Sequence, residues 1–323
     1  MRTLFFLLLF AVSSCQSPAG DKATATVKIA SIASDSIPKK GVFSNTVDKL
    51  DKYWHQGLGE INVYKLRQNR YKDIYDGQAV LIFVSEDFLT DKQVKNDQYQ
   101  SDQSTSIIKT NSIIRFNTGI YDYSLMTSVF TPVRTKDWPV SLKVTQTSQD
   151  WCGQTFSQLN WQKADSYKQQ SNSYFEKEGD KVENSSADLL EDELMNRIRM
   201  GWKHLPQGKY RMIPSMNFLG LKHKAFGAYE AKLSVVDYSG KHFSTNASLK
   251  SYHIYYPEFD RTLEIVFHAE APFLIEGWID TYPSIFDKKK RSSIAIREKT
   301  VLKAYWSENA PEDSVLRTEL GLK

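Results

Sequence analysis

The chain has 323 residues, and its 42 Lys and Arg residues nearly balance 38 Asp and Glu residues, for a formal net charge of +4. This balance gives no support for a nucleic-acid partner, because such proteins carry a strongly basic surface. The one basic run, 288–291, lies between two segments with strand patterns, and a solvated turn is favoured there over a contact with a phosphate or a lipid headgroup.

The first 15 residues have the order of an export signal. Arg2 is followed by an apolar run over 4–12, by two serines and by Cys15. The run is much shorter than the roughly 20 residues of a membrane-spanning helix, so it fits the hydrophobic part of a cleaved signal. The segment 12–15 resembles the bacterial lipobox, in which the cysteine is lipidated and becomes the mature N-terminus. A cleaved signal with an incidental cysteine is the alternative.

We therefore predict a signal peptide over 1–14 and lipidation at Cys15, which together imply a membrane partner held through acyl chains. Gln16 follows in place of an aspartate, which by analogy with lipoprotein sorting favours the outer membrane, facing the periplasm. Residues 15–41 have the composition of a flexible tether. A β-rich domain is expected over 42–310, either as one unit or as two lobes, 42–182 and 205–310, bridged by a helix.

Alternating apolar and polar residues predict strands through most of the body. The apolar run 79–84 indicates a strand covered on both faces, and Asn117-Thr118-Gly119 predicts a hairpin turn. Connections this short imply antiparallel neighbours. The sequence thus predicts a mainly β fold: one or more curved antiparallel sheets, as a sandwich or half-barrel. The predicted strands are 61–71, 79–84, 107–116, 121–130, 140–145, 151–161, 167–178, 210–214, 229–236, 251–256, 262–268, 273–280 and 293–306.

One helix is expected near 186–200. Ser185 and Asp188 resemble a capping box, and Leu190, Leu194 and Ile198 repeat with helical spacing. Acidic residues precede basic ones along this segment, which complements the helix dipole. The apolar stripe should pack against the sheet.

Catalytic and metal-binding patterns are not found. Cys152 lies in a segment with strand alternation, which favours a buried, inert thiol over a nucleophile. The six histidines are scattered singly, and His253 with His268 is the best pair that strand pairing could bring together. Neither a hydrolase elbow nor a phosphate-binding glycine loop is present in the sequence. We therefore assign no catalytic residue, no metal and no cofactor.

Two clusters of aromatic and polar residues are the candidate ligand-binding sites. The first contains Trp54, His55 and Glu60, and the second contains Glu276 and Trp278. An indole beside a carboxylate can bind a sugar through its ring face and directed hydrogen bonds, although half-buried strands use the same residues for packing.

Several segments together resemble a family of uncharacterised exported proteins and lipoproteins of Gram-negative bacteria, some of which carry the label septum formation inhibitor Maf. The basic phosphate-binding motif of Maf nucleotide pyrophosphatases is not present in this sequence. The late Glu-Gly-Trp in a β-rich pattern is also similar to curved-sheet lipoprotein carriers of the LolA and LolB kind. The segments that carry the family resemblance, within about 49–282, are YWHQGLGEINVYKL, QAVLIFVSEDF, FNTGIYDYSLMTSVF, QDWCGQTFSQLN, NSYFEKEGD, LKHKAFGAYEA, RTLEIVF and IEGW.

Two functional hypotheses follow. The favoured one is a non-catalytic, lipid-anchored envelope protein whose apolar groove binds a lipid, a glycan or an envelope protein. The other is a hydrolase of envelope glycans or esters that uses Glu60, Glu86, Asp87, Cys152 or a histidine, and it requires at least two of these side chains within hydrogen-bond distance.

Overall fold

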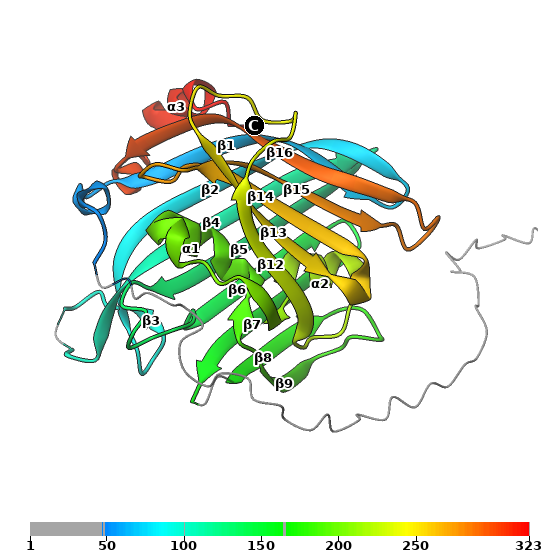
Figure 1. Cartoon of the computed structure of the whole chain (residues 1–323), viewed down its shortest axis with the longest axis horizontal. Coiled ribbons are helices and arrows are strands. Elements are labelled where there is room, and N and C mark those ends of the chain that lie inside the picture. Colours follow the sequence, from blue (N-terminus) through cyan, green and yellow to red (C-terminus); the bar gives the residue numbers. More distant parts are fainter. Residues whose placement is uncertain (1–46, 48, 100, 164–165, 323) are drawn as a thin grey trace, which may run out of the picture. The chain divides into compact units, whose positions relative to one another are not determined.

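The computed structural model describes residues 47, 49–99, 101–163 and 166–322. These residues form one curved sheet of 16 strands (Figure 1), which confirms the predicted mainly β, antiparallel fold. The sheet is open, with β10 at one edge of the ladder and β9 at the other. Predictions on the signal peptide, Cys15 and the tether lie outside the described residues.

The first strand, β1 (Gly59–Arg70), lies in the middle of the sheet, between β2 and β16. On one side of β1 the chain forms a meander of β2 (Asp73–Leu89), β4 (Ser104–Thr118), β5 (Tyr121–Pro132), β6 (Lys143–Asp150), β7 (Gly153–Gln162), β8 (Ser166–Ser173) and β9 (Lys181–Ser186), with β3 (Val94–Lys95) beside β2. On the other side, from the edge inward, lie β10 (Leu189–Leu190), β11 (Gly208–Ile213), β12 (Tyr229–Asp237), β13 (Leu249–Tyr256), β14 (Arg261–His268), β15 (Ile275–Pro283) and β16 (Lys290–Lys303). Among the described strands, only β10 and β11 pair in parallel.

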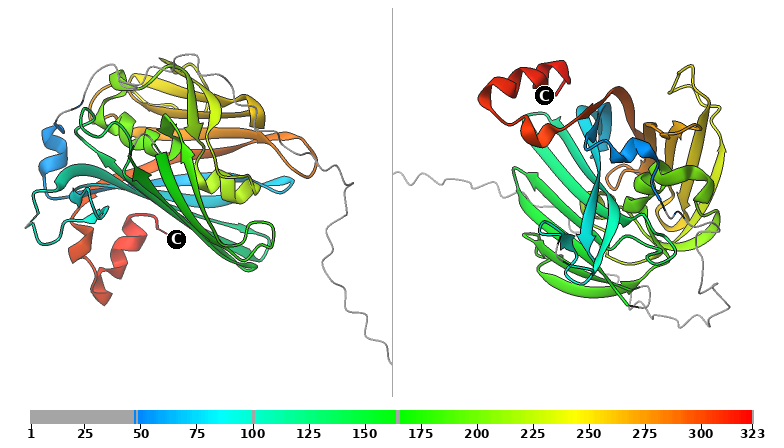
Figure 2. Two further views of the ribbon diagram at one scale, coloured as in Figure 1. Left: turned by 90° about the horizontal axis from the view of Figure 1, so that it is seen from below. Right: turned by 90° about the vertical axis from the view of Figure 1, so that its left-hand side faces the viewer.

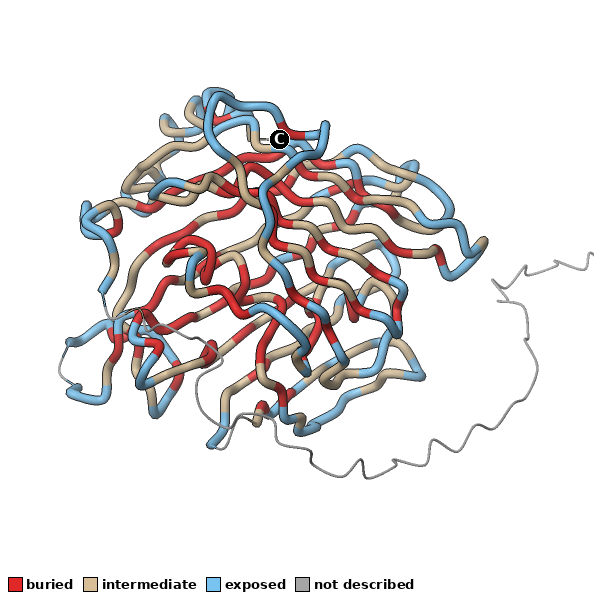
Figure 3. Tube along the Cα trace, viewed as in Figure 1, coloured by how far each residue is buried: buried red, intermediate tan, exposed pale blue. Residues whose placement is uncertain are grey.

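The curvature brings the inner faces of the two halves of the sheet toward each other, with α1 (Leu194–Gly201) and α2 (Met216–Lys222) between them (Figure 2). The main apolar cluster fills this space and includes Leu81 from the centre of the sheet, Ile198 from α1 and Phe218 from α2. Figure 3 shows buried residues along the strands of both halves. Within the described ranges, each helix falls short of the length and hydrophobicity that crossing a bilayer requires.

The outer face of the central strands is covered by the C-terminal segment, which contains α3 (Val315–Glu319). Val80 packs there in a second apolar cluster with Leu320, while Leu81 points into the main cluster. The prediction that 79–84 is covered on both faces is therefore confirmed. The C-terminal helical segment itself was not predicted. The 3-10 turns are η1 (Lys52–His55), η2 (Glu191–Glu193), η3 (Trp202–His204), η4 (Pro257–Phe259), η5 (Tyr305–Ser307) and η6 (Pro311–Ser314).

The predicted helix begins later than its capping pattern indicates. Ser185 belongs to β9 and Leu190 to β10, and the α-helix starts only at Leu194. Backbone pairing explains the difference, because residues 189–190 hydrogen-bond to 212–213 of β11 and are extended. Ile198 is buried, as the apolar stripe requires. Several strand predictions were also too long. Trp151 lies in a turn, and the segment after Ser173 is a hairpin connection. The strand predicted from 140 begins at Lys143, and the one predicted to end at 306 ends at Lys303.

Candidate functional site

A cavity of about 130 Å³ lies between the two halves of the sheet, beside α2. Its apolar lining comes from both halves: Ile114 and Leu125 belong to β4 and β5, whereas Leu263, Ile265 and Trp278 belong to β14 and β15. These residues face inward because side chains alternate along each strand. The cavity is thus formed by segments far apart in sequence.

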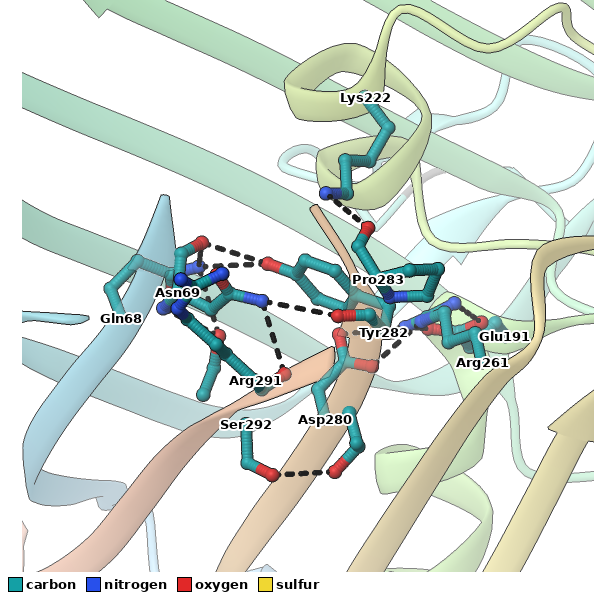
Figure 4. A network of polar contacts seen from close by, with 12 residues as sticks. Gln68, Asn69, Glu191, Lys222, Arg261, Asp280, Tyr282, Pro283, Arg291 and Ser292 are labelled. Carbon is teal, nitrogen blue, oxygen red and sulfur yellow. Dashed lines mark hydrogen bonds and ion pairs between the residues drawn. The ribbon is translucent and has the colours of Figure 1, made fainter. Parts of the chain in front are cut away.

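The polar side of the cavity is built around Arg261, which is buried in β14. The two terminal guanidinium nitrogens each donate to one oxygen of Glu191 at 2.7 Å, and Nε donates to Asp280 at 2.7 Å (Figure 4). The guanidinium carbon lies 4.0 Å from the ring centroid of Phe218 in α2. Burial raises the pKa of Asp280 although Arg261 opposes the shift. Both carboxylates are therefore already occupied by the arginine.

Asp192, the residue after Glu191, also lines the cavity. Its Oδ2 accepts a hydrogen bond from the backbone nitrogen of Met216 at 3.0 Å, at the start of α2. Burial raises the pKa of Asp192 to about 7, and the negative charge of Glu191 adds to the shift. A carboxyl group with this pKa exchanges its proton near neutral pH and can act as a hydrogen-bond donor as well as an acceptor.

Lys222, at the end of α2, supplies a cation to the cavity. Its Nζ donates to the carbonyl oxygen of Pro283 at 3.3 Å and lies 4.1 Å from the ring centroid of Tyr282. Burial lowers the pKa of Lys222 to about 8, and repulsion from Arg70 contributes to the shift. Within the described residues Lys222 forms no ion pair, in contrast to Arg261. The amine is therefore available to an anion.

Of the residues predicted from the sequence, Trp278 lines this cavity and the others lie elsewhere. Trp54 is buried, with its ring 4.9 Å from the guanidinium of Arg199, and His55 is exposed in η1. Glu60 pairs with both terminal nitrogens of Arg199 and accepts a hydrogen bond from Tyr53. Burial acts to raise the pKa of Glu60, but Arg199 outweighs it and the pKa lies below its usual range. The first predicted cluster is thus a buried ion pair enclosed by aromatic rings.

Glu276 lies two residues before Trp278 on β15 but has its own partners. It accepts hydrogen bonds from Arg297 and, at 2.9 Å, interacts with Nε2 of His268. Burial acts to raise the pKa of Glu276, but His268 and Arg297 together hold it below its usual value. The second predicted cluster therefore splits between an ion-pair network and the cavity.

The side chains that the hydrolase hypothesis requires lie in separate parts of the structure. Glu86 pairs with Lys109 at 2.6 Å, and Asp87 accepts a hydrogen bond from Ser106 at 3.1 Å. The prediction that Cys152 is buried in a strand was wrong: it is exposed in the turn between β6 and β7, where the hydroxyl of Tyr121 donates to its sulfur. In the described part of the chain, no hydrogen bond joins Glu60, Glu86, Asp87 or Cys152 to a histidine.

The histidines do not form the expected pair. His253 lies opposite Glu264 in the ladder and His268 opposite Leu249, so the two are several positions apart. His253 instead shares a hydrogen-bond network with Ser251, at 2.7 Å. Over the described ranges, no group of three or more His, Cys, Asp or Glu side chains could hold a metal ion.

Sequence reasoning missed the polar residues of the cavity, among them Asp192, Lys222, Arg261 and Asp280. Each is a common surface residue type, and each lies in a different element. Only the acidic run 191–193 carried a signal, since three consecutive carboxylates include at least one that must face away from the others.

No family model, curated protein or solved structure matches the chain. The family resemblance therefore stays a prediction. The function proposed below rests on the cavity and on the sequence.

Proposed function

We propose that this is a lipid-anchored cell-envelope protein that binds a small organic anion non-catalytically in the cavity beside α2. The observation that carries the binding role is that Lys222 and Asp192 both line the polar side of the cavity, opposite its apolar lining. Lys222 is a partly buried amine without an ion pair among the described residues, and Asp192 has a pKa of about 7. Buried polar groups without strong partners are costly, so a ligand that engages them contributes binding energy.

The dimensions of the cavity support a small ligand. A cavity of about 130 Å³ is close to the ~150 Å³ apolar cavity known to hold benzene. Trp278, Leu125 and Ile265 would contact an apolar body of that size. A carboxylate on that body would accept hydrogen bonds from Lys222 and from protonated Asp192. Thr127 offers a further group, because its Oγ1 is buried and has no hydrogen-bond partner among the described residues.

The ligand class is therefore a monocarboxylate with a compact apolar body, such as benzoate or a branched short-chain acid. The lipid, glycan or envelope protein expected from the sequence would need a larger contact surface. Binding would raise the pKa of Lys222 toward its usual range, because a carboxylate offsets the cost of burying the ammonium group.

Calorimetric titration with benzoate, phenylacetate and isovalerate tests the proposal, with benzamide as the neutral counterpart of benzoate. We expect at least one acid to bind, and the amide to bind about ten-fold more weakly or worse. The Lys222→Met variant should lose the preference for the acid, because Met retains the apolar stem without the charge. The matched control is Lys224→Met, which removes an exposed neighbouring amine. Equal binding of acid and amide, or equal loss in both variants, would contradict the proposal.

The envelope location is tested separately. The purified native protein should begin at Cys15 and carry acyl chains in its mass spectrum, and Cys15→Ser should leave the membrane fraction. An unmodified N-terminus would overturn the anchor without affecting the titration above.

A further inference from the structure

Six hairpin connections lie at the same end of the sheet. Neighbouring strands are antiparallel, so the connections alternate between the two ends, and every second one shares an end. In Figure 1 these connections are on the right side of the sheet. They join β1 to β2, β4 to β5, β6 to β7, β8 to β9, β13 to β14 and β15 to β16.

Aromatic side chains of these connections touch one another across the sheet. Phe286 and Tyr71 have ring centroids 5.7 Å apart, and the hydroxyl of Tyr71 lies 2.6 Å from that of Tyr123. Tyr121 contacts Tyr123 at 5.3 Å and Trp151 at 6.0 Å. We call these five residues, of which Tyr123 is itself buried beneath the others, together with the exposed Ile120, Tyr174 and Ile285 beside them, the aromatic rim.

The aromatic rim is open to solvent at its tips. Ile120 is 81% exposed, Trp151 60% and Phe286 53%. Isolated exposed apolar residues are common, but a connected set at the tips of adjacent hairpins is typical of an interaction surface.

Charges around the rim are arranged asymmetrically. Asp150 accepts hydrogen bonds from its own turn, Glu178 pairs with His223, and Asp287 pairs with Arg291. The exposed carboxylates of Asp122 and Glu176 are exceptions, since neither forms an ion pair with a described residue. In contrast, four exposed lysines form no ion pair with any described residue: Lys72, Lys177, Lys288 and Lys289. The charges free to meet a partner are thus mostly positive.

We propose that the aromatic rim docks on the surface of a bilayer that contains anionic phospholipids. Trp and Tyr rings favour the membrane interface, where an apolar body and a polar edge are both accommodated. Lysines near an anionic leaflet are attracted to it, whereas protein interfaces are depleted of lysine. The rim therefore fits a membrane better than a protein partner. This inference goes beyond the proposed function and requires neither the cavity ligand nor the acyl anchor.

The test uses the full chain with Cys15→Ser, so that no acyl chain contributes and Cys152 is the remaining thiol. Cys152 is exposed next to Trp151 in the rim, and a polarity-sensitive dye attached there reports contact with lipid. Vesicles of phosphatidylcholine with about a quarter phosphatidylglycerol should shift the dye emission to the blue, and vesicles of phosphatidylcholine alone should do so much less. The shift should fall as salt is added.

Variants then test whether the aromatic rim is the part of the protein that binds the vesicles. Ile120→Ser with Phe286→Ser, or Lys288→Gln with Lys289→Gln, should each weaken vesicle binding about ten-fold or more. Trp306→Ser is the matched control, because Trp306 is also exposed but follows β16 at the opposite end of the sheet. Binding without a change in dye emission would show attachment through another region, such as the retained leader, and would overturn the proposal. So would equal weakening by Trp306→Ser, or a dye shift that depends on protein concentration without vesicles, which would indicate a protein partner.

Discussion

Arg261 of β14 donates a hydrogen bond from each terminal nitrogen to a separate oxygen of Glu191, both at 2.7 Å. This contact fixes the turn that precedes α1 against the second half of the sheet. Since the next residue along that turn is Asp192, the same contact positions the carboxyl group that lines the cavity. The ion pair is therefore a positioning element for the proposed site.

Replacing Arg261 by Met should be strongly destabilising. The carboxylates of Glu191 and Asp280 would stay buried without a cation, which costs about 3–5 kcal/mol of the free energy of unfolding. Lys290→Met is the matched control, because it breaks the exposed pair with Asp260, worth at most about 1 kcal/mol. Urea unfolding of both variants measures the difference. Similar losses in the two variants would contradict a special role for Arg261.

The raised pKa of Asp192 predicts a specific pH dependence. Its pKa is about 7 in the folded state and near the ordinary aspartate value of 3.8 in the unfolded state. Between these values the unfolded chain binds fewer protons, so this residue lowers the free energy of unfolding as pH rises from about 4 to about 7. The total loss is at most about 4 kcal/mol, and it levels off above pH 7.

Asp192→Asn removes the titration while keeping a carbonyl oxygen that can accept from Met216. Relative to the wild type, the variant should become more stable as pH rises through this window. Urea unfolding at several pH values measures the difference between the two proteins. A stability difference that is constant with pH would refute the assigned pKa shift.

The sheet was largely predictable, whereas its interior was not. Period-two patterns identify strands because one face is buried, as at Leu81 and Phe83, and short connections imply a meander. The buried charges in and beside α1 could not be predicted, because charged residues normally face water. Glu193, which directly precedes α1, accepts hydrogen bonds from the backbone and hydroxyl of Ser141, and Arg199 of α1 pairs with Glu60. All four residues are buried. Partners this distant in sequence leave no local signal.

The candidate site was missed for the same physical reason. Asp192 and Lys222 acquire unusual pKa values mainly because they are buried between the two halves of the sheet. Trp278 was identified because an aromatic residue after Glu-Gly stands out in sequence, but its function as cavity lining depends on β4 and β5 of the opposite half. A local pattern can indicate residue chemistry, and the fold determines which residues share a cavity.

The glycine of that Glu-Gly-Trp sequence should be sensitive to substitution. A Cβ at Gly277 would overlap the carbonyl oxygen of Ala295 and the ring of Phe243, so Gly277→Ala should cost about 1–3 kcal/mol of stability. Gly220, inside α2, has open space at the same position, and Gly220→Ala should be neutral or stabilising by up to about 1 kcal/mol. Thermal unfolding of the two variants measures the difference in stability. An unchanged stability of Gly277→Ala would show that β15 and β16 are not packed this closely.

Cys152 should react with a thiol reagent in the folded protein. The backbone nitrogen of Cys152 donates to Asp150 at 2.7 Å, which holds the turn so that the side chain is exposed. Tyr121→Phe should slow the reaction a few-fold, because a hydroxyl that donates to the sulfur stabilises the thiolate, which is the form that reacts. Absorbance with an aromatic disulfide reagent measures the rate, and the unfolded chain gives the total thiol count: one if Cys15 is a lipid thioether and two if it is free. A thiol that reacts only after unfolding would place Cys152 back in the interior and would remove the labelling site on which the vesicle experiment depends.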